Sequence, residues 1–312
     1  MHQGGASRER MSMNILVTGA SGFIGAALVE RLTGTGHRVV PLRRLSAASE
    51  AGPTWNPQAG QVRLEPASPL DAVIHLGGEN IAQRWTTAAR ERIRASRVDA
   101  TRLLCEALAR LPQPPRVLVC ASATGYYGDR GGEVLDEKSA PGKGFLPEVC
   151  QAWEAAADSA RQHGIRVVHL RFGIVLAPHG GSLAKMLPAF RLGLGGRLGN
   201  GRQYWSWIAL EDLCRVVDLA LLDDRLSGAV NTVSPEPVTN AEFTDRLARA
   251  LRRPALLPMP AIAVKLLFGQ MGREALLASA RVRPVRLLES GFEFRFAPLD
   301  AAFRHRLDAT RQ

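Results

Sequence analysis

The chain has 312 residues, a formal net charge of +11, 46% hydrophobic residues and 22% charged residues. This composition is typical of a soluble globular protein that can bury a large core. The most apolar stretch, residues 254–272, contains Lys265 and three prolines, which excludes a membrane-spanning helix there. Basic residues are spread along the chain without a block, so we expect only weak attraction to polyanions and no specific nucleic-acid binding.

The N-terminal residues and the cysteines indicate the cellular compartment expected for the protein. Residues 1–12, MHQGGASRERMS, have no apolar core and are predicted to be a disordered or spurious extension rather than a secretory signal. No cysteine pair has CxxC spacing and the histidines show no ligand spacing, so no metal site is predicted. We expect reduced, buried thiols in a cytoplasmic protein at Cys105, Cys120, Cys150 and Cys214.

Strands and helices alternate through the first half of the chain. Strands are expected at 14–18, 37–42, 71–78, 116–121 and from residue 165, with helices at 26–32, 86–110 and 148–161. The stretch 45–69 is rich in Ala, Pro and Gly and is predicted to be a loop. This order predicts an α/β fold: a Rossmann doubly wound parallel sheet over residues 13–176, completed by later segments.

The alternation weakens after residue 176. A helix at 209–224, a short strand at 228–234 and a helix beginning at Thr239 or Asn240 are expected, followed by an apolar helical tail. Residues 177–312 are therefore predicted to form mainly a small C-terminal α/β lobe that holds the substrate, ending in a helical segment.

A glycine-rich turn follows the first strand and opens the first helix. Gly19, Gly22 and Gly25 have G-x-x-G-x-x-G spacing, and in a strand–turn–helix context this predicts a dinucleotide site. The helix N-terminus would supply free N–H groups to a diphosphate. Ser21, Phe23 and Ile24 lie in the same turn and are expected to contact the cofactor.

Two further strand ends are expected to complete the cofactor site. An NAD site usually has Asp or Glu at the end of the second strand, but this chain has Arg43 and Arg44. Arginines suit a 2′-phosphate, so NADP(H) is predicted rather than NAD. The third strand ends in Leu76, Gly77 and Gly78. This segment is expected to pass beneath the adenosine ribose, where larger side chains than those of the glycines would clash.

Longer motifs give the chain a family resemblance. VTGASGFIG (17–25), HLGGENIAQRW (75–85), SATGYYG (122–128) and GRQYWSWIALEDL (201–213) are distinctive in content and order. The sequence resembles the atypical, extended-type short-chain dehydrogenase/reductases of the epimerase superfamily, in their SDR39U1-like subgroup, over nearly all of residues 13–307. The resemblance implies a Rossmann domain that binds NADP and a small C-terminal lobe, and it names no substrate.

The resemblance also shows what this chain lacks. Relatives use a Tyr-x-x-x-Lys pair, and the matching positions here are Leu146 and Cys150. Relatives carry Asn in an N-V-x-G-T motif where this chain has Arg97. Arg97 is predicted to contact a phosphate or ribose of the cofactor, with a surface salt bridge as the alternative.

The hydroxyl expected to orient the substrate is Ser122, with Thr124 as the alternative. Tyr126, an extra tyrosine at this strand end, is the candidate to exchange the proton in place of the missing pair. A phenol titrates near pH 10 and needs a nearby cation to work at neutral pH. Tyr127 matches a non-catalytic tyrosine of relatives, Ala123 holds their usual Ser/Thr position, and Glu148 is a weaker acid candidate. In the alternative, both tyrosines only pack the sheet edge.

Residues near the second lobe complete the predicted site. The resemblance implies that Gly173 and Val175 border the nicotinamide. Basic and aromatic residues of the Gly-rich region suit an anionic substrate. Substrate contacts are predicted at Lys185, Arg202 and Trp205.

Two functions stay open from the sequence. The first is an NADP-binding oxidoreductase or epimerase-like enzyme that moves hydride to or from a carbonyl or a sugar-nucleotide-like substrate. The second is a catalytically degenerate NADP-binding protein that acts through a partner, supported by the missing Tyr/Lys pair and by plant relatives linked to organelle division. The substrate and the oligomeric state are not predicted.

Overall fold

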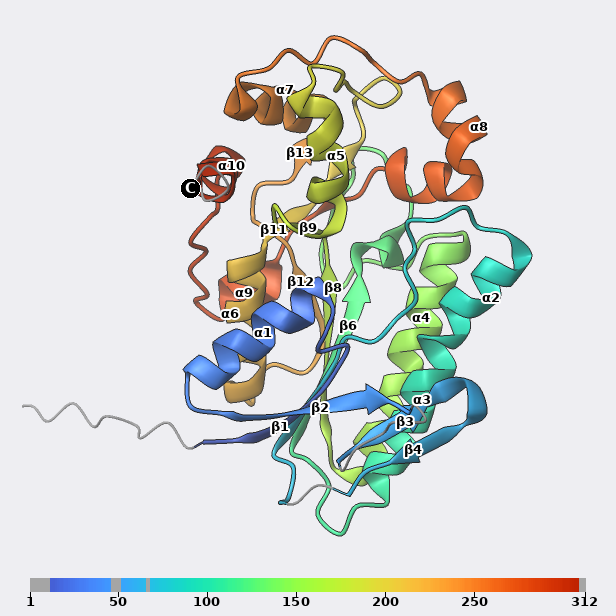
Figure 1. The fold of residues 1–312 in the computed structure, drawn as a ribbon, viewed down its shortest axis with the longest axis vertical. Helices are drawn as coiled ribbons and strands as arrows, with labels where there is room; N and C mark the ends of the chain where they lie inside the picture. Colours follow the sequence, from blue (N-terminus) through green and yellow to red (C-terminus); the bar gives the residue numbers. More distant parts are fainter. Residues whose placement is uncertain (1–11, 46–51, 66–67, 309–312) are drawn as a thin grey trace, which may run out of the picture.

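The fold is taken from a computed structural model, which describes residues 12–45, 52–65 and 68–308. The predicted extension at residues 1–12 therefore lies outside the described residues, except for Ser12. Figure 1 shows a large central sheet with helices on both faces and a second, smaller lobe beyond one end of the sheet.

The central sheet has eight strands in the order β12-β8-β6-β5-β1-β2-β3-β4. Neighbouring strands are parallel, except that β3 and β4 are antiparallel. In chain order the strands are β1 (Asn14–Thr18), β2 (Arg38–Arg44), β3 (Thr54–Asn56), β4 (Gln61–Arg63), β5 (Ala72–His75), β6 (Val117–Ala123), β8 (Arg166–Phe172) and β12 (Gly228–Thr232). This confirms the Rossmann prediction.

The prediction of a loop at 45–69 was wrong where the structure describes it. It contains β3, the 3-10 turn η1 (Pro57–Ala59) and β4, which extend the sheet beyond β2. Trp55 is buried against the sheet and explains why so short a hairpin holds its place. Strands of three residues are too short for an alternating pattern to reveal them.

Two hydrophobic layers cover the two faces of the sheet. On one face, α1 (Phe23–Gly34) and α6 (Leu210–Leu222) bury residues such as Leu28 and Val216. On the other, α3 (Val98–Ala109), α4 (Phe145–Asp158) and the following turn η3 (Ser159–His163) bury residues such as Leu104 and Trp153. Both layers are visible on either side of the sheet in Figure 1.

The single helix predicted at 86–110 is broken. The structure has α2 (Thr87–Ala95) and α3, separated at Ser96 and Arg97. The Ser96 hydroxyl donates to the Ile93 carbonyl at 3.0 Å and accepts from the Glu79 amide at 2.9 Å. A serine that bonds back to a helical carbonyl bends the helix, and the bend directs Arg97 toward the sheet.

The second lobe begins where the strand predicted from residue 165 splits. After Gly173 the chain leaves the sheet as β9 (Ile174–Leu176), which pairs with β11 (Trp207–Ala209). The lobe also contains α5 (Gly181–Arg191), β10 (Tyr204–Trp205), β13 (Val238–Thr239), α7 (Asn240–Leu251), α8 (Ala261–Met271), the π-helical turn η4 (Gly272–Leu276) and α10 (Leu299–Asp308). Thr239 caps α7 with a capping box, which confirms the predicted helix start.

Later segments also return to the first lobe. β12 is the last strand of the Rossmann sheet, and α6 packs in the helical layer on one of its faces. The strand β14 (Arg281–Val282) pairs with β7 (Val134–Leu135), and α9 (Val285–Glu289) follows it. In the part of the chain that the structure describes, no helix is long and apolar enough to cross a membrane. All four cysteines are buried, as predicted.

Candidate cofactor and active site

The carboxyl ends of the parallel strands meet at one edge of the sheet, below the second lobe (Figure 1). Thr18 at the end of β1 pairs with Leu42 of β2 and His75 of β5. The glycine turn, the Arg43–Arg44 pair and the Leu76–Gly78 segment therefore lie at three neighbouring strand ends. In Rossmann sheets, ligands bind at this edge.

The glycine turn has the geometry of an anion cradle. Gly19 has a φ of +68°, and a Cβ on Gly25 would collide with the Gly19 carbonyl. Gly22 is the N-cap of α1 and offers no side chain to the amides of the first turn. Ser21, Gly22 and Phe23 are exposed, whereas Ile24 packs against the core. A phosphate at this helix N-terminus would find free donors.

Arg43 and Arg44 are exposed at the end of β2, one strand from the glycine turn. Because Leu42 lies opposite Thr18, the two arginines extend past the end of β1. A guanidinium at this position suits the 2′-phosphate of NADP.

The β5 end is held by a buried chain of hydrogen bonds. The Thr101 hydroxyl donates to the Arg97 carbonyl, so His75 Nε2 donates to Thr101 Oγ1 at 2.9 Å. His75 Nδ1 then accepts from Thr18 Oγ1 at 2.7 Å, and Thr18 Oγ1 accepts from the Leu76 and Gly77 amides. Burial, with the nearby charge of Arg97, lowers the pKa of His75 to about 4. A neutral His75 therefore fixes the backbone of Leu76 and Gly77.

Arg97 lies against the neighbouring Gly78. A Cβ at Gly78 would stand 3.2 Å from the guanidinium carbon, so a side chain there would require the guanidinium to shift. The guanidinium also lies 5.1 Å from the ring centroid of Trp153 on α4. The surface salt bridge considered from the sequence is absent: the described residues place no carboxylate within 4.0 Å of Arg97.

A buried polar network occupies the ends of β6 and β8. Arg171 Nε and Nη2 donate to the two oxygens of Glu154 at 2.8 Å each. Ser122 Oγ donates to Glu154 Oε1 at 2.6 Å, and Arg171 Nη1 donates to the Tyr127 hydroxyl at 2.9 Å. Burial alone would lower the pKa of Arg171, but its bonds to Glu154 raise the pKa above the ordinary value. Ser122 is only 2% exposed, so its hydroxyl serves this network rather than an open site.

Tyr126 and Tyr127 have different environments. Tyr127 is buried, its hydroxyl contacts Asn231 Oδ1 at 2.7 Å, and burial raises its pKa to about 12. Tyr126 is partly exposed, and its ring face lies 3.5 Å from the Arg171 guanidinium carbon. Among the described residues, nothing hydrogen-bonds the Tyr126 hydroxyl, which is therefore the phenol free to meet a ligand.

The positions of the missing pair are apolar. Leu146 is buried, and a Cβ on Gly125 would lie 3.4 Å from its side chain. Burial raises the pKa of the Cys150 thiol to about 12, so Cys150 supplies no charge. Glu274, from η4 of the second lobe, accepts from the Leu146 amide at 3.0 Å and so ties the start of α4 to that lobe.

The other residues predicted to contact the cofactor or the substrate differ in their exposure. Gly173 lies at the split between β8 and β9, and Val175 packs into the core under the second lobe. Lys185 and Arg202 are exposed. Trp205 is buried in the core, with its ring centroid 5.2 Å from that of Phe243, so it does not line a cleft as predicted. Glu148 is exposed in the first turn of α4 and lines a surface pocket with Arg94.

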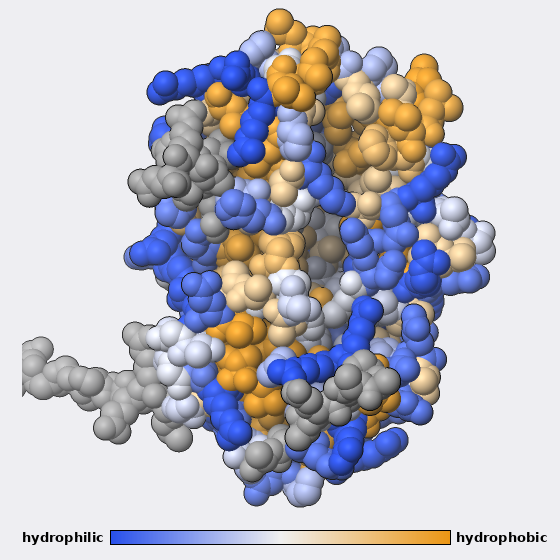
Figure 2. Space-filling model, viewed as in Figure 1, coloured by the Kyte–Doolittle hydropathy of each residue, from blue (hydrophilic) through white to orange (hydrophobic). Residues whose placement is uncertain are grey.

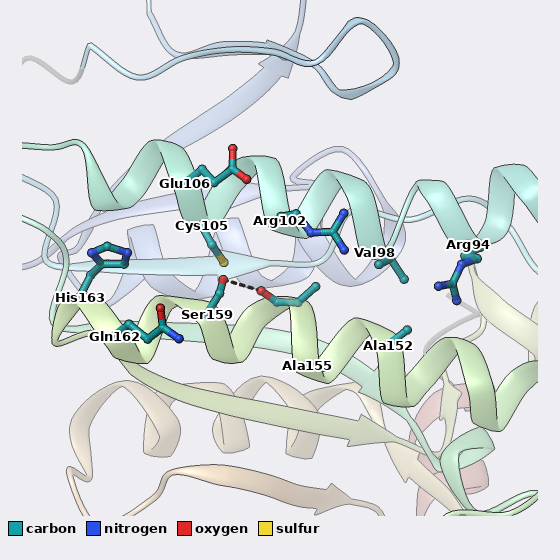
Figure 3. A pocket seen from close by; sticks show the side chains of 11 residues that line it. Arg94, Val98, Arg102, Cys105, Glu106, Ala152, Ala155, Ser159, Gln162 and His163 are labelled. Carbon is teal, nitrogen blue, oxygen red and sulfur yellow. Dashed lines mark hydrogen bonds between the residues drawn. The ribbon is translucent and has the colours of Figure 1, made fainter.

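A groove between α3 and α4 is a separate surface feature. Figure 3 shows it running along the two helices, with Cys105 and Ser159 facing each other across it. It contains no strand end, so it does not belong to the cofactor cradle. The face in Figure 2 is hollowed instead near its middle, below the second lobe.

Sequence reasoning missed four polar residues of this edge: His75, Glu154, Arg171 and Glu274. Arg171 alone could have been suspected from the sequence, because a charged residue is unusual within a mostly apolar strand such as VVHLRF. Within the described residues, no cluster of three or more His, Cys, Asp or Glu could hold a metal ion.

A glycine cradle, basic residues on the second strand and a switch-point cleft define the class of Rossmann proteins that bind dinucleotides. Residues 15–232 match the NAD dependent epimerase/dehydratase family, and residues 259–305 match a domain of unknown function, DUF1731. The chain belongs to this epimerase family, in its SDR39U1-like branch.

The relatives cover nearly the whole chain. An epimerase family protein of Mycobacterium bovis, Mb2239, is 43% identical over 90% of this chain and 93% of its own length. The human epimerase family protein SDR39U1 is 37% identical over 94% of this chain and 99% of its own length. A crystal structure of human SDR39U1 isoform 2 with NADPH has a TM-score of 0.84 and 34% identity, covering 95% of this chain and 99% of that one.

Proposed function

We propose that this protein binds NADPH at the glycine cradle and transfers hydride between it and a carbonyl or secondary alcohol. The observation that carries the proposal is the open N-terminus of α1, with exposed Arg43 and Arg44 one strand away. The NADPH named in the human relative's structure supports the choice of cofactor. The cradle would hold the diphosphate, and the arginines would hold the 2′-phosphate.

The chain's own groups divide the remaining work. The cofactor supplies the hydride when bound. Tyr126 exchanges the proton with the substrate oxygen, because its hydroxyl is the uncommitted phenol at the β6 end. Arg171 lies on the face of its ring and holds the ring in place, while Ser122 acts through Glu154 as a positioning residue. Exposed Lys185 and Arg202 suit an anionic substrate, such as a sugar nucleotide.

One observation favours a second function. Leu146 and Cys150 leave no Tyr/Lys pair on α4, and both side chains are buried. The absence of this pair is expected of a protein that binds NADP without catalysis and whose NADP-bound form is recognised by a partner.

NADPH and NADH titrations followed by fluorescence test the cofactor assignment. We expect NADPH to bind at least tenfold more tightly than NADH, and Arg43→Ala with Arg44→Ala to remove most of that preference. Tight NADH binding without NADPH binding would contradict the assignment.

Oxidation of NADPH with a panel of carbonyls separates the two functions. An enzyme should lose at least a hundredfold in kcat with Tyr126→Phe while keeping its Kd for NADPH. Activity unchanged by this substitution would remove Tyr126 from the mechanism. Binding of NADPH without turnover of any carbonyl would favour the regulatory function.

A further inference from the structure

Exposed aliphatic side chains gather on the second lobe. The described residues include twelve large hydrophobic side chains that are exposed, and seven of these lie in the stretches 192–194 and 256–267, which we call the leucine patch. Leu256 and Ile262 are 77% and 72% exposed. Figure 2 shows apolar atoms at the top of this lobe, on its side away from the central sheet of Figure 1. Apolar area concentrated in this way marks an interaction surface.

The two stretches of the leucine patch meet through their backbones. Leu194 forms an antiparallel bridge with Ala255, and the Leu257 amide donates to the Gly195 carbonyl at 3.3 Å. The three prolines in residues 254–260 have no backbone N–H. Because so many of its donors are paired or missing, this backbone can approach an apolar phase at a low cost in lost hydrogen bonds to water.

Helix α8 continues the patch with one outward face. Ile262, Lys265 and Leu266 are exposed and have i, i+3, i+4 spacing, whereas Val264 is buried against Gly272. An apolar helical face that also carries a basic residue is typical of a helix that lies in the plane of a membrane interface.

The charges that flank the leucine patch along the chain are all positive. Residues 182–210 and 246–273 contain no aspartate or glutamate. The exposed cations nearest to the patch in these ranges are Arg191, Arg197, Arg249, Arg252, Arg253 and Lys265. In the part of the chain that the structure describes, none of these six forms a salt bridge. Arginines and lysines beside an apolar surface are attracted to anionic lipid headgroups.

We propose that the leucine patch docks on an anionic lipid surface, with its leucines among the headgroups and its cations at the phosphates. The exposed large hydrophobic residues of the patch are leucines and one isoleucine, whereas hot spots between proteins are enriched in Trp and Tyr and poor in Leu. A second copy of the chain would bring like charges face to face. The glycine cradle lies below the second lobe, so the patch and the cofactor site are separate surfaces (Figure 1).

Sedimentation of the full chain with lipid vesicles tests the proposal. Wild type should bind vesicles of phosphatidylcholine with about 30% phosphatidylglycerol at least about tenfold more tightly than vesicles of phosphatidylcholine alone. Raising the salt from about 0.1 M to about 0.5 M should weaken this binding at least about fivefold, because salt screens the attraction. No cofactor is added, so the outcome does not depend on the proposed function.

One pair of substitutions removes apolar area from the patch. Ile262→Ser with Leu266→Ser should weaken binding to the anionic vesicles at least about fivefold, because less apolar surface is buried among the headgroups. The matched control, Leu222→Ser with Leu288→Ser, changes two exposed leucines elsewhere and should bind like wild type. Melting temperatures close to that of wild type would confirm that both variants are folded.

A second pair removes charge from the patch. Arg191→Gln with Arg253→Gln should also weaken binding to the anionic vesicles at least about fivefold. The matched control is Arg102→Gln with Arg110→Gln, two exposed arginines of α3, and it should bind like wild type.

Several results would overturn the proposal. One is wild type that binds neither kind of vesicle. Another is equal binding by the patch variants and their controls, since the net charge of +11 would then act without a defined face. A loss confined to the arginine pair would exclude the leucines from the contact. A dimer in sedimentation velocity that Ile262→Ser with Leu266→Ser abolishes, without vesicle binding, would assign the face to a second copy of the chain.

Discussion

Two arginines lie at the same edge of the sheet, with β6 between them, and have opposite environments. Arg171, at the end of β8, is 4% exposed and makes a two-pronged pair with Glu154. Arg97, beside the end of β5, bonds only to neutral oxygens and keeps one edge open. The guanidinium of Arg171 is paired with a carboxylate, and that of Arg97 has only neutral partners.

The difference shows which part of the edge is scaffold and which part is site. The network of Ser122, Glu154, Arg171 and Tyr127 satisfies its own charges, as buried polar groups do when they maintain a structure. A charge that the protein itself leaves uncompensated is a candidate for a ligand contact. Tyr126 lies between this network and the candidate site. Its ring face contacts the Arg171 guanidinium, and its hydroxyl bonds to no described residue.

The largest predicted effect comes from breaking the complete pair. Arg171→Met leaves the Glu154 carboxylate buried without a cation and should lower the free energy of unfolding by about 3–5 kcal/mol. Urea unfolding followed by circular dichroism measures it. Adding Glu154→Gln should restore a large part of the loss, and an equal loss in both variants would mean that packing rather than charge dominates.

The next effect is a pH dependence at His75. The pKa of His75 is about 4 in the folded protein, below the usual value near 6.5, so the unfolded chain binds a proton more readily between these values. Its contribution to stability is complete above pH 6.5 and is lost as the pH falls toward 4. The loss should reach about 3 kcal/mol.

Comparison with His75→Gln isolates that dependence from other groups. The difference in unfolding free energy between the two proteins should shrink as the pH falls from 7 to 4. A difference that stays constant over this range would mean that His75 is not held neutral in the fold.

A smaller effect is expected at the contact between the lobes. Glu274→Gln removes the negative charge at the N-terminus of α4, where Glu274 accepts from the Leu146 amide. It should cost about 1 kcal/mol of stability, the usual worth of a helix cap and its dipole interaction. Glu289→Gln, an exposed change on α9, is the matched control and should cost nothing measurable.

The sequence predicted those parts of the site that depend on local order. The glycine turn lies between a strand and a helix that both have clear periodicity, and Thr239 carries its own capping signal. The pairing of Arg171 with Glu154 joins a strand to a helix, and the break at Ser96 depends on the distant amide of Glu79. Trp205 lies in the Gly-rich region that predicts substrate contacts, but it packs against Phe243, which is far along the chain. Such long-range contacts leave no local pattern.

The smallest stability effect is expected for Tyr126→Phe, which tests whether Tyr126 belongs to the buried network or to the candidate site. The ring that covers Arg171 is kept, and the lost hydroxyl bonds to no described residue, so stability should change by less than about 0.5 kcal/mol. Tyr127→Phe, in contrast, removes a hydroxyl that contacts both Arg171 and Asn231 and should cost about 1–3 kcal/mol. Equal losses in parallel urea titrations would place Tyr126 in the scaffold. If Tyr127→Phe loses more stability and only Tyr126→Phe loses turnover, the Tyr126 hydroxyl acts on the substrate.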